Sequence, residues 1–173
     1  MYPGLSTCST AYAVLIARAL GAEITAVCST AKIDFVRSLG ADHVIDYTRD
    51  DFTAGEQRYD LILDIAGNTS LTGLRRVLTP RGTLVIVGGE DGGRWFGGID
   101  RQLRAVALSP FVRQRLTMLT PNENHSHLER VAELLDGDRL ATVIERTYPL
   151  RETPAAMRHL EGGHARGKLV IAM

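Results

Sequence analysis

Strand and helix signals alternate most clearly in residues 23–47, which read EITAVCSTAKIDFVRSLGADHVIDY. The first part, EITAVCS, is typical of a strand, and AKIDFVRSL then has the spacing of apolar residues that favours a helix. Gly40 follows that helical segment directly, where helices commonly end in a left-handed residue. A short strand signal, HVIDY, completes the stretch at 43–47. Helices that alternate with short strands indicate a parallel sheet.

The same alternation continues on both sides of this stretch. Upstream, residues 11–20 predict an amphipathic helix that ends at Gly21. Downstream, YDLILDIAG at 59–67 contains the nearly continuous apolar run of a strand buried on both faces. SLTGLRRVLTP then predicts a helix stopped by Pro80, and GTLVIVGG predicts another buried strand. We therefore expect an α/β protein with a doubly wound parallel sheet.

Beyond Gly89 the pattern is less regular. Residues 99–108 predict a helix, QRLTMLTP predicts an edge strand, and NHSHLERVAELLDG predicts a helix. The tail reads as strand, helix and strand in LATVIERTYPL, TPAAMRHLEGG and GKLVIAM. Thr153 is the expected N-cap of this last helix, with Pro154 at its first position.

Composition argues against several classes of protein. The 173 residues carry 20 Lys and Arg and 20 Asp and Glu, so bulk charge predicts neither nucleic acid nor an anionic membrane as a partner. No apolar run reaches the roughly 20 residues that a transmembrane helix requires, and the N-terminus has no signal-peptide pattern. Cys8 and Cys28 form no CxxC motif and no cluster with histidine, so we expect no metal site. A cytoplasmic location is the prediction.

The strand after the first helix decides the choice of cofactor. Ligands of doubly wound folds bind at the carboxyl ends of the strands, where an acidic residue holds the ribose 2′-hydroxyl of NAD. Cys28 and Ser29 stand at that strand end, with Lys32 close behind. The lost carboxylate removes repulsion and the ammonium attracts a 2′-phosphate, so the sequence favours NADP(H). A solvated Lys32 on the first helical turn is the alternative interpretation.

Five segments in order resemble the cofactor-binding half of the medium-chain dehydrogenases/reductases. They are AVLIARALGAEITAVCST, VRSLGADHVIDYTRDDF, YDLILDIAGN, LRRVLTPRGTLVIVGG and EGGHARGKLVIAM. The zinc-free quinone oxidoreductase branch is the most similar, and the resemblance runs from about Ala11 to Met173. It implies a Rossmann-type fold and hydride transfer between a nicotinamide cofactor and a carbonyl, enone or quinone.

The resemblance also implies a set of cofactor-binding residues. In these relatives a lysine after the second strand and a tyrosine fifteen residues later hold the 2′-phosphate, and Lys32 and Tyr47 have that separation. The loops after YDLILD and TLVIV line the nicotinamide riboside, although glycines at strand ends also serve simple turns. No catalytic acid or base and no metal ligand is identified. The expected cofactor-binding residues are Ser29, Thr30, Lys32, Tyr47, Ala66, Gly67, Val87, Gly88 and Gly89.

The segment before Ala11 departs from the family. Relatives have a strand and a glycine-rich phosphate loop there, followed by the helix that binds the pyrophosphate at its N-terminus. Only Gly4 remains a glycine among the loop positions, and the upstream catalytic domain is absent from the sequence. We therefore expect an N-terminally truncated enzyme. The aligned loop positions are Gly4, Leu5, Ser6, Thr7, Cys8, Ser9 and Thr10.

The family resemblance divides the chain into three parts. Residues 1–10 are a non-family segment, and residues 11–139 are a Rossmann-type NADP-binding domain whose first strand and glycine-rich loop are missing or degenerate. Residues 140–173 form a strand–helix–strand unit that in the family joins the catalytic domain. The missing strand leaves open sheet edges, so we expect a homodimer or a higher oligomer of low thermal stability. As an extended segment, residues 6–10 would fill only part of the gap that the missing strand leaves in the sheet.

Two functions from different classes remain open. The first is an NADP(H)-dependent oxidoreductase that acts on a small carbonyl or quinone substrate, with no turnover expected from the isolated chain. The second is a non-catalytic nucleotide-binding module or an inactive remnant. A methyltransferase ranks third, because that fold usually has an acid where Cys28 stands.

Overall fold

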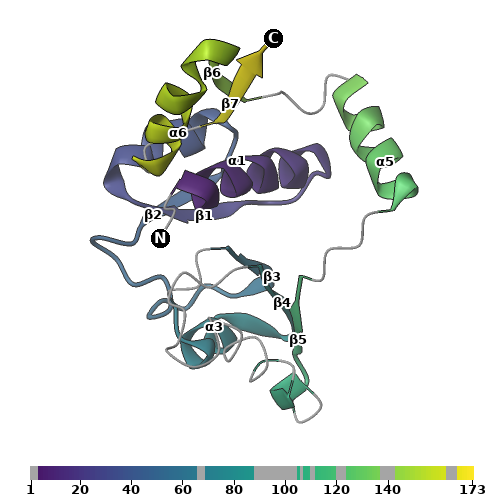
Figure 1. Cartoon of the computed structure of the whole chain (residues 1–173). Helices are drawn as coiled ribbons and strands as arrows, with labels where there is room; N and C mark the ends of the chain where they lie inside the picture. The colour runs from purple at the N-terminus through teal and green to yellow at the C-terminus, as the bar shows by residue number, and fades with distance from the viewer. Residues whose placement is uncertain are drawn as a thin grey trace. The chain divides into compact units, whose positions relative to one another are not determined.

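The computed structural model describes residues 4–65, 69–87, 105, 107–109, 112–119, 124–136, 143–162 and 167–173. Helices separate most of its strands, as Figure 1 shows, but the strands at 43–46 and 59–64 follow one another without a helix between them. The order is α1 (Gly4–Ala19), β1 (Thr25–Cys28), η1 (Thr30–Lys32), α2 (Ile33–Ser38), β2 (His43–Asp46), β3 (Tyr59–Asp64), α3 (Leu71–Arg76), β4 (Leu78–Ile86), β5 (Arg115–Met118), α5 (His125–Asp136), β6 (Ile144–Pro149), η3 (Leu150–Glu152), α6 (Thr153–Glu161) and β7 (Lys168–Ala172).

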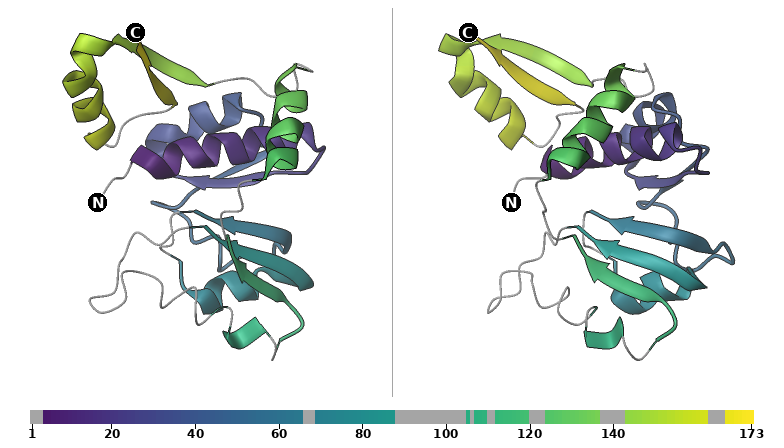
Figure 2. Two further views of the ribbon diagram at one scale, coloured as in Figure 1. Left: turned by 45° about the vertical axis from the view of Figure 1, so that its right-hand side comes forward. Right: turned by 90° about the vertical axis from the view of Figure 1, so that its right-hand side faces the viewer.

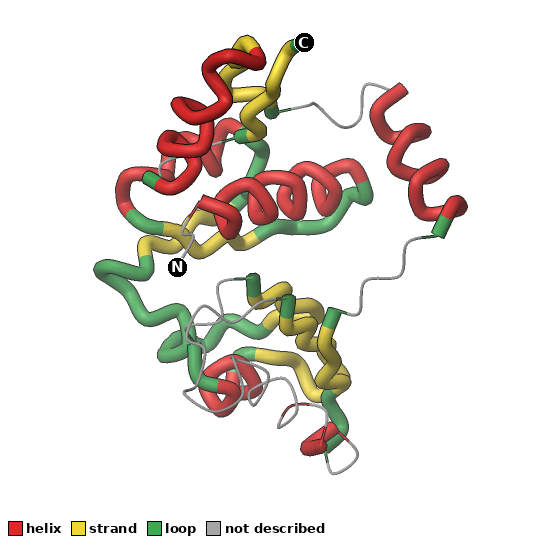
Figure 3. The backbone as a smooth tube through the Cα atoms, in the orientation of Figure 1, coloured by secondary structure: helices red, strands yellow, loops and turns green. Residues whose placement is uncertain are grey.

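The described strands form three parallel sheets in two compact units. One unit comprises Met1–Asp50 with Glu123–Met173 and contains the sheets β1-β2 and β6-β7. The other comprises Asp51–Asn122 and contains the sheet β3-β4-β5. Every pair of neighbouring strands in these sheets is parallel, which confirms the expected α/β class. Figure 3 shows the three yellow strands of the second unit side by side.

The first unit has a core built from α1, β1 and α2. Its buried side chains include Val14, Ala26 and Val36, one from each element. Gly21 ends α1 with φ of 76° and Gly40 follows α2 with φ of 98°, so both glycines have the left-handed conformation predicted for them. Both turns reverse the chain after a helix, and each leads into a strand of the β1-β2 sheet.

The helix α1 is longer than the sequence predicts. It begins at Gly4, so residues 4–10 are helical and no part of Ser6–Thr10 forms the extended segment considered above. Extending an existing helix by one residue needs no new nucleation, which allows weak helix formers such as serine and threonine to be included. Ser6–Thr10 therefore does not fill part of the gap left by the missing strand.

The second unit has its core on one face of the β3-β4-β5 sheet. Leu84 and Ile86 of the central strand β4 are 0% exposed and pack with Leu74 of α3. The views of Figure 2 show α3 beside this sheet. On the opposite face, Leu61 and Leu63 of β3 are 56% and 44% exposed. The prediction that this strand is buried on both faces is wrong, because the described core covers only one face.

Pro80 lies inside β4 rather than at the end of a helix. The helix α3 already ends at Arg76, and Ser70 caps its start by accepting a hydrogen bond from the Gly73 N–H at 3.1 Å. The pairing of β3 with β4 shifts between Leu78 and Thr83. Because the missing N–H of Pro80 falls in this irregular stretch, the strand tolerates a proline that would disrupt a regular ladder.

The chain ends in the parallel strands β6 and β7, and α6 connects them in the sequence. The hydroxyl of the buried Tyr148 in β6 forms a hydrogen bond with His159 Nδ1 of α6 at 2.8 Å. On the other side of the ring, His159 Nε2 lies 3.3 Å from Glu145 Oε1. The expected N-cap is wrong, because η3 runs directly into α6 and Thr153 is already helical. An N-cap needs an extended backbone, whereas Glu152, the residue before α6, has φ of −99° and ψ of 11°.

Within the described residues, no helix is long and apolar enough to cross a membrane. The helix α5 is amphipathic, yet its apolar side chains Leu128, Val131 and Leu135 are 67%, 40% and 39% exposed. Among the described strands, β1 pairs with β2 alone and β3 pairs with β4 alone. Both are therefore edge strands of the described sheets.

Candidate functional site

The carboxyl ends of β1 and β2 lie next to each other. The parallel register pairs Cys28 with Asp46, the last residues of the two strands. The N–H of Tyr47 donates to the carbonyl oxygen of Cys28 at 3.1 Å, which extends the pairing one step beyond the sheet. Ligands of parallel sheets bind at this kind of edge, and four of the predicted residues follow the two strand ends.

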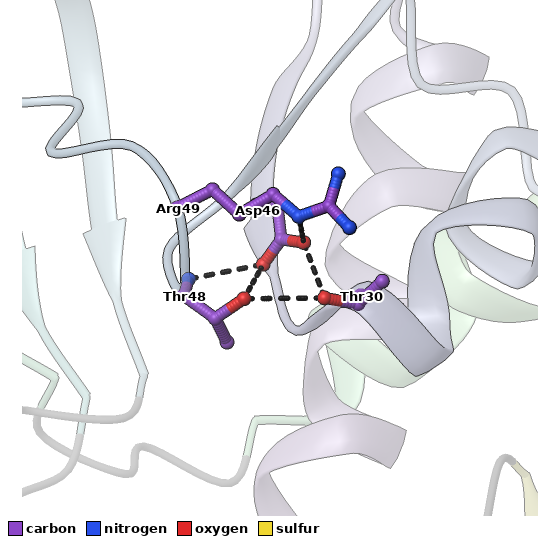
Figure 4. Close-up of polar contacts among 4 residues, drawn as sticks. All are labelled: Thr30, Asp46, Thr48 and Arg49. Atoms are coloured by element: carbon purple, nitrogen blue, oxygen red, sulfur yellow. Dashed lines mark hydrogen bonds and ion pairs between the residues drawn. The ribbon is translucent and has the colours of Figure 1, made fainter.

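A buried carboxylate organises this edge (Figure 4). Asp46 is 6% exposed and accepts hydrogen bonds from the Thr30 hydroxyl and from the N–H and hydroxyl of Thr48, at 3.0 and 2.7 Å for Thr48. Arg49 Nε lies 3.7 Å from Asp46 Oδ2. The hydrogen bonds from Thr30 and then Thr48 hold the pKa of Asp46 below its usual value, so this carboxylate is charged at neutral pH.

A tight turn follows the end of β1. The N–H of Lys32 donates to the carbonyl of Ser29 at 2.9 Å, which closes the single 3₁₀ turn η1. Ser29 is half-buried, Thr30 is exposed, and Lys32 is half-buried close enough to Cys28 to influence its thiol. Burial, followed by the charge of Asp46, raises the pKa of the Cys28 thiol, and Lys32 opposes that rise.

The structure brings four of the predicted cofactor residues to one sheet edge. Ser29, Thr30 and Lys32 follow β1, and Tyr47 follows β2 with a side chain that is 62% exposed. Val87 follows β4 in the other compact unit, where its N–H donates to the carbonyl of Asp64 at 2.9 Å. The remaining predicted residues, Ala66, Gly67, Gly88 and Gly89, lie outside the described residues.

Sequence reasoning missed the role of Asp46 and its partners. The signal was present in IDYTR, because a threonine two residues after an aspartate commonly donates back to that carboxylate. The contribution of Thr30 carried no such signal, since it lies 16 residues away in sequence. The structure therefore adds Asp46, Thr48 and Arg49 to this edge.

The amino-terminal segment does not supply the phosphate loop of the family pattern. Residues 4–10 are the first turns of the helix α1, so this segment is not the glycine-rich loop that holds the phosphate in the family pattern. Within the described part of the chain, no group of three or more His, Cys, Asp or Glu side chains is placed to hold a metal ion.

Parallel strands joined by helices, with polar groups at the strand ends, are typical of the doubly wound α/β class, whose ligands bind at the carboxyl ends of the strands. Solved structures support this class. The quinone oxidoreductase of Coxiella burnetii superposes with a TM-score of 0.73 over 94% of this chain and 48% of its own, at 26% identity. The Rossmann-type fold expected from the sequence is thereby confirmed.

The family follows from the sequence comparisons. Residues 39–171 match the family model described as zinc-binding dehydrogenase, so the chain belongs to that family. It is 34% identical over 176 residues to the mitochondrial NAD(P)H oxidoreductase RTN4IP1 of Mus musculus. It is 27% identical over 164 residues to a chloroplast envelope quinone oxidoreductase homolog of Arabidopsis thaliana. The resemblance to quinone oxidoreductase-like medium-chain dehydrogenases/reductases is confirmed.

The match covers most of this chain but only part of each relative. Both relatives align with 92% of the chain, whereas the aligned part is 44% of the mouse protein and 48% of the plant protein. The chain thus spans slightly less than half the length of these relatives.

Proposed function

We propose that this chain is the NADP(H)-binding half of an oxidoreductase that reduces a small carbonyl, enone or quinone. The observation that carries the proposal is the arrangement around Asp46. The carboxylate at this sheet edge is buried and engaged by Thr30 and Thr48, while β1 ends in Cys28 and has no acidic residue directly after it. The edge therefore presents no exposed carboxylate at the end of β1 to select the ribose 2′-hydroxyl of NAD.

The groups at this edge suit a 2′-phosphate. Ser29 and Tyr47 offer hydroxyls, Lys32 an ammonium, and Arg49 a guanidinium that is 74% exposed. A phosphate prefers charge-assisted hydrogen bonds from such groups. Arg49 also offsets the charge of Asp46, which otherwise repels an anion. We assign the 2′-phosphate to these four residues.

The cofactor, when bound, supplies the hydride, and the protein orients it and excludes water. The nicotinamide end is assigned to Ala66, Gly67, Val87, Gly88 and Gly89 on the family resemblance, and Val87 is the described member. The names of the mouse and plant relatives support NAD(P)H and quinone chemistry. We also propose that the cofactor-binding domain ends at residue 139 and that the C-terminal strand–helix–strand unit begins at residue 140. A cytoplasmic location of the protein is part of the same proposal.

The alternative is a non-catalytic nucleotide-binding module or an inactive remnant. The helical state of residues 4–10 favours the remnant, because this segment does not form the loop that cradles a pyrophosphate in the family. We expect NADPH oxidation with quinones or enones to stay at background for the isolated chain, since catalysis requires the substrate to be held within reacting distance. Robust turnover by the pure chain would overturn that expectation.

Binding of nucleotide fragments tests the cofactor assignment directly. Calorimetric titrations compare the affinity for NADPH with that for NADH. A second comparison uses 2′,5′-ADP and 5′-AMP, because these fragments contain only the adenosine end of the cofactor. Charge-assisted hydrogen bonds to phosphate contribute roughly 1.5–3 kcal/mol each, so the 2′-phosphate ligands should bind at least tenfold more tightly. Lys32→Ala should reduce that preference.

Lys168→Ala is the matched control. Lys168 lies in β7, where its ammonium is 5.7 Å from the ring centre of Tyr12, and it is not part of the proposed phosphate site. The preference for the 2′-phosphate should survive in this variant. Equal affinity for the phosphorylated and unphosphorylated ligands, or an unchanged preference in Lys32→Ala, would refute the assignment.

A further inference from the structure

A cleft of about 490 Å³ opens in the second unit, at the amino-terminal ends of its strands. It lies between the last turns of α3, the beginning of β4 and the residues that lead into β5. Its lining residues are Thr72, Arg75, Arg76, Pro80, Val112, Arg113 and Gln114. A second hollow shares Pro80 and Arg113 with it and adds Arg81. The cofactor edge proposed above is formed by the opposite, carboxyl-terminal ends of strands.

One arginine of the cleft is held in place by a glutamine. Gln114 accepts a hydrogen bond from Arg75 Nε at 3.2 Å and donates from its own amide to the carbonyl oxygen of Arg75 at 2.8 Å. Arg75 is half-buried, and these two contacts join α3 to the approach of β5 across 39 residues of sequence. The guanidinium is therefore positioned before any ligand arrives, which reduces the entropy lost on binding.

The positive charges of the cleft are not balanced by described carboxylates. Within the described residues, none of Arg75, Arg76, Arg81 and Arg113 forms an ion pair with an acidic side chain. Among the described acidic groups, Asp51 is influenced by Arg76, but its carboxylate accepts its hydrogen bonds from Thr53. Asp60 accepts from the Thr79 hydroxyl at 3.0 Å.

We propose that this arginine cleft binds a small molecule carrying two or more phosphate groups. Guanidinium groups bind phosphate oxygens through paired hydrogen bonds, and the hydroxyl of Thr72 adds an uncharged donor. The volume of the cleft falls within the range of about 300–1,000 Å³ typical of small-molecule sites. Pro80 and Val112 leave an apolar strip beside the charges, which suits an organic group attached to the phosphates.

Several phosphates are favoured over one because the arginines come from separate segments. Arg75 and Arg76 end α3, Arg81 lies in β4, and Arg113 precedes β5. A single phosphate satisfies one or two guanidinium groups, whereas a chain of phosphates reaches more of them. Bringing like charges together costs energy in the empty cleft, and a polyanion removes that repulsion.

Calorimetry with inorganic tripolyphosphate and with inorganic phosphate tests the proposal on the full chain at low ionic strength. We expect saturable binding of tripolyphosphate with one site per chain, and at least tenfold weaker binding of phosphate. Arg75→Gln and Arg113→Gln should each weaken tripolyphosphate binding about tenfold, the loss expected for one charge-assisted contact. Arg113 is exposed, so its variant should keep the fold even if Arg75→Gln does not.

Arg151→Gln is the control for net charge. Arg151 lies in η3 of the other compact unit, its side chain is 84% exposed, and it lines neither hollow. This variant should bind tripolyphosphate like the wild type. Absence of saturable binding, or equal weakening in all three variants, overturns the proposal. Tighter binding of an acidic peptide or of an RNA oligonucleotide than of tripolyphosphate also overturns it, because the occupant would then be a macromolecule.

Discussion

The hydroxyl of Thr30 donates to the carboxylate of Asp46 across 16 residues of sequence, at the shared end of β1 and β2. This contact joins the turn after the first strand to the end of the second. It is also the leading reason why the pKa of Asp46 is lowered. The same hydrogen bond thus favours the charged form of the Asp46 carboxylate, although this side chain is only 6% exposed.

Asp46 should make the stability of the protein depend on acidity. Because its folded pKa lies below the ordinary value of about 3.9, its contribution is present above that value and is lost as pH falls toward the folded pKa. Asp46→Asn should lower the melting temperature at pH 7 and lose less stability than the wild type between about pH 5 and pH 3. Thermal melts across this range provide the measurement.

Asp34→Asn is the control for that experiment. The Asp34 side chain is 102% exposed and lies 3.9 Å from Arg37, so its removal should leave the acid dependence unchanged. If Asp46→Asn and the wild type lost stability in parallel, the hydrogen bonds to Asp46 would have no energetic role.

The Cys28 thiol should resist alkylation in the folded protein. Burial and then the charge of Asp46 raise its pKa, so less of the reactive thiolate is present near pH 8 than for an ordinary cysteine. In a Cys8→Ser background, iodoacetamide should modify Cys28 much more slowly in buffer than in urea, as followed by mass spectrometry. Equal rates would contradict the burial of this residue. Stability should correspondingly fall as pH rises above about 8.5, where the unfolded chain ionises first.

Two helix-ending glycines should be sensitive to replacement by alanine. Gly21 and Gly40 both have positive φ, and a left-handed backbone costs other residues roughly 1–2 kcal/mol. A Cβ on Gly21 meets no atom within 4 Å, whereas one on Gly40 collides with the Arg18 side chain, which must move. Gly40→Ala should therefore be the more destabilising variant in urea denaturation. Two variants with the stability of the wild type would show that neither turn is constrained.

Leu84 should be a major contributor to the core of the second unit. It lies in the central strand β4 with 0% exposure, so Leu84→Ala removes packing worth roughly 2–5 kcal/mol. Leu150→Ala deletes the same atoms from a side chain that is 61% exposed and should change stability by less than about 0.5 kcal/mol. Urea denaturation followed by circular dichroism compares the two. A similar loss in both would rule out a packed core around Leu84.

The open edges of the described sheets should promote self-association. β3 is an edge strand whose Leu61 and Leu63 are exposed, and unpaired strand edges recruit other chains. We expect light scattering to report a dimer or larger species, with a low melting temperature. Leu61→Lys should shift the population toward monomer, because a charge on an edge strand opposes pairing. A monodisperse wild-type monomer with a sharp, cooperative melt would refute this prediction.

Local patterns in the sequence were sufficient to predict the structural features that interactions between neighbouring residues control. Gly21 and Gly40 are recognisable because a left-handed turn after a helix requires a residue without a Cβ. The segment LVI at 84–86 is recognisable as part of a strand because buried parallel strands contain continuous apolar residues. These signals were enough to predict an α/β protein with parallel strands and to direct attention to Lys32, whereas Tyr47 was predicted from the family resemblance.

Tertiary structure decided the features that depend on pairing between distant segments. The exposure of Leu61 depends on which elements cover the sheet, and the engagement of Asp46 by Thr30 requires β1 and β2 to align in register. Likewise, Gln114 positions Arg75 because β5 returns beside α3, 39 residues later. Residue type and spacing report local backbone preference, whereas burial and charge balance are set by the neighbours that folding brings together.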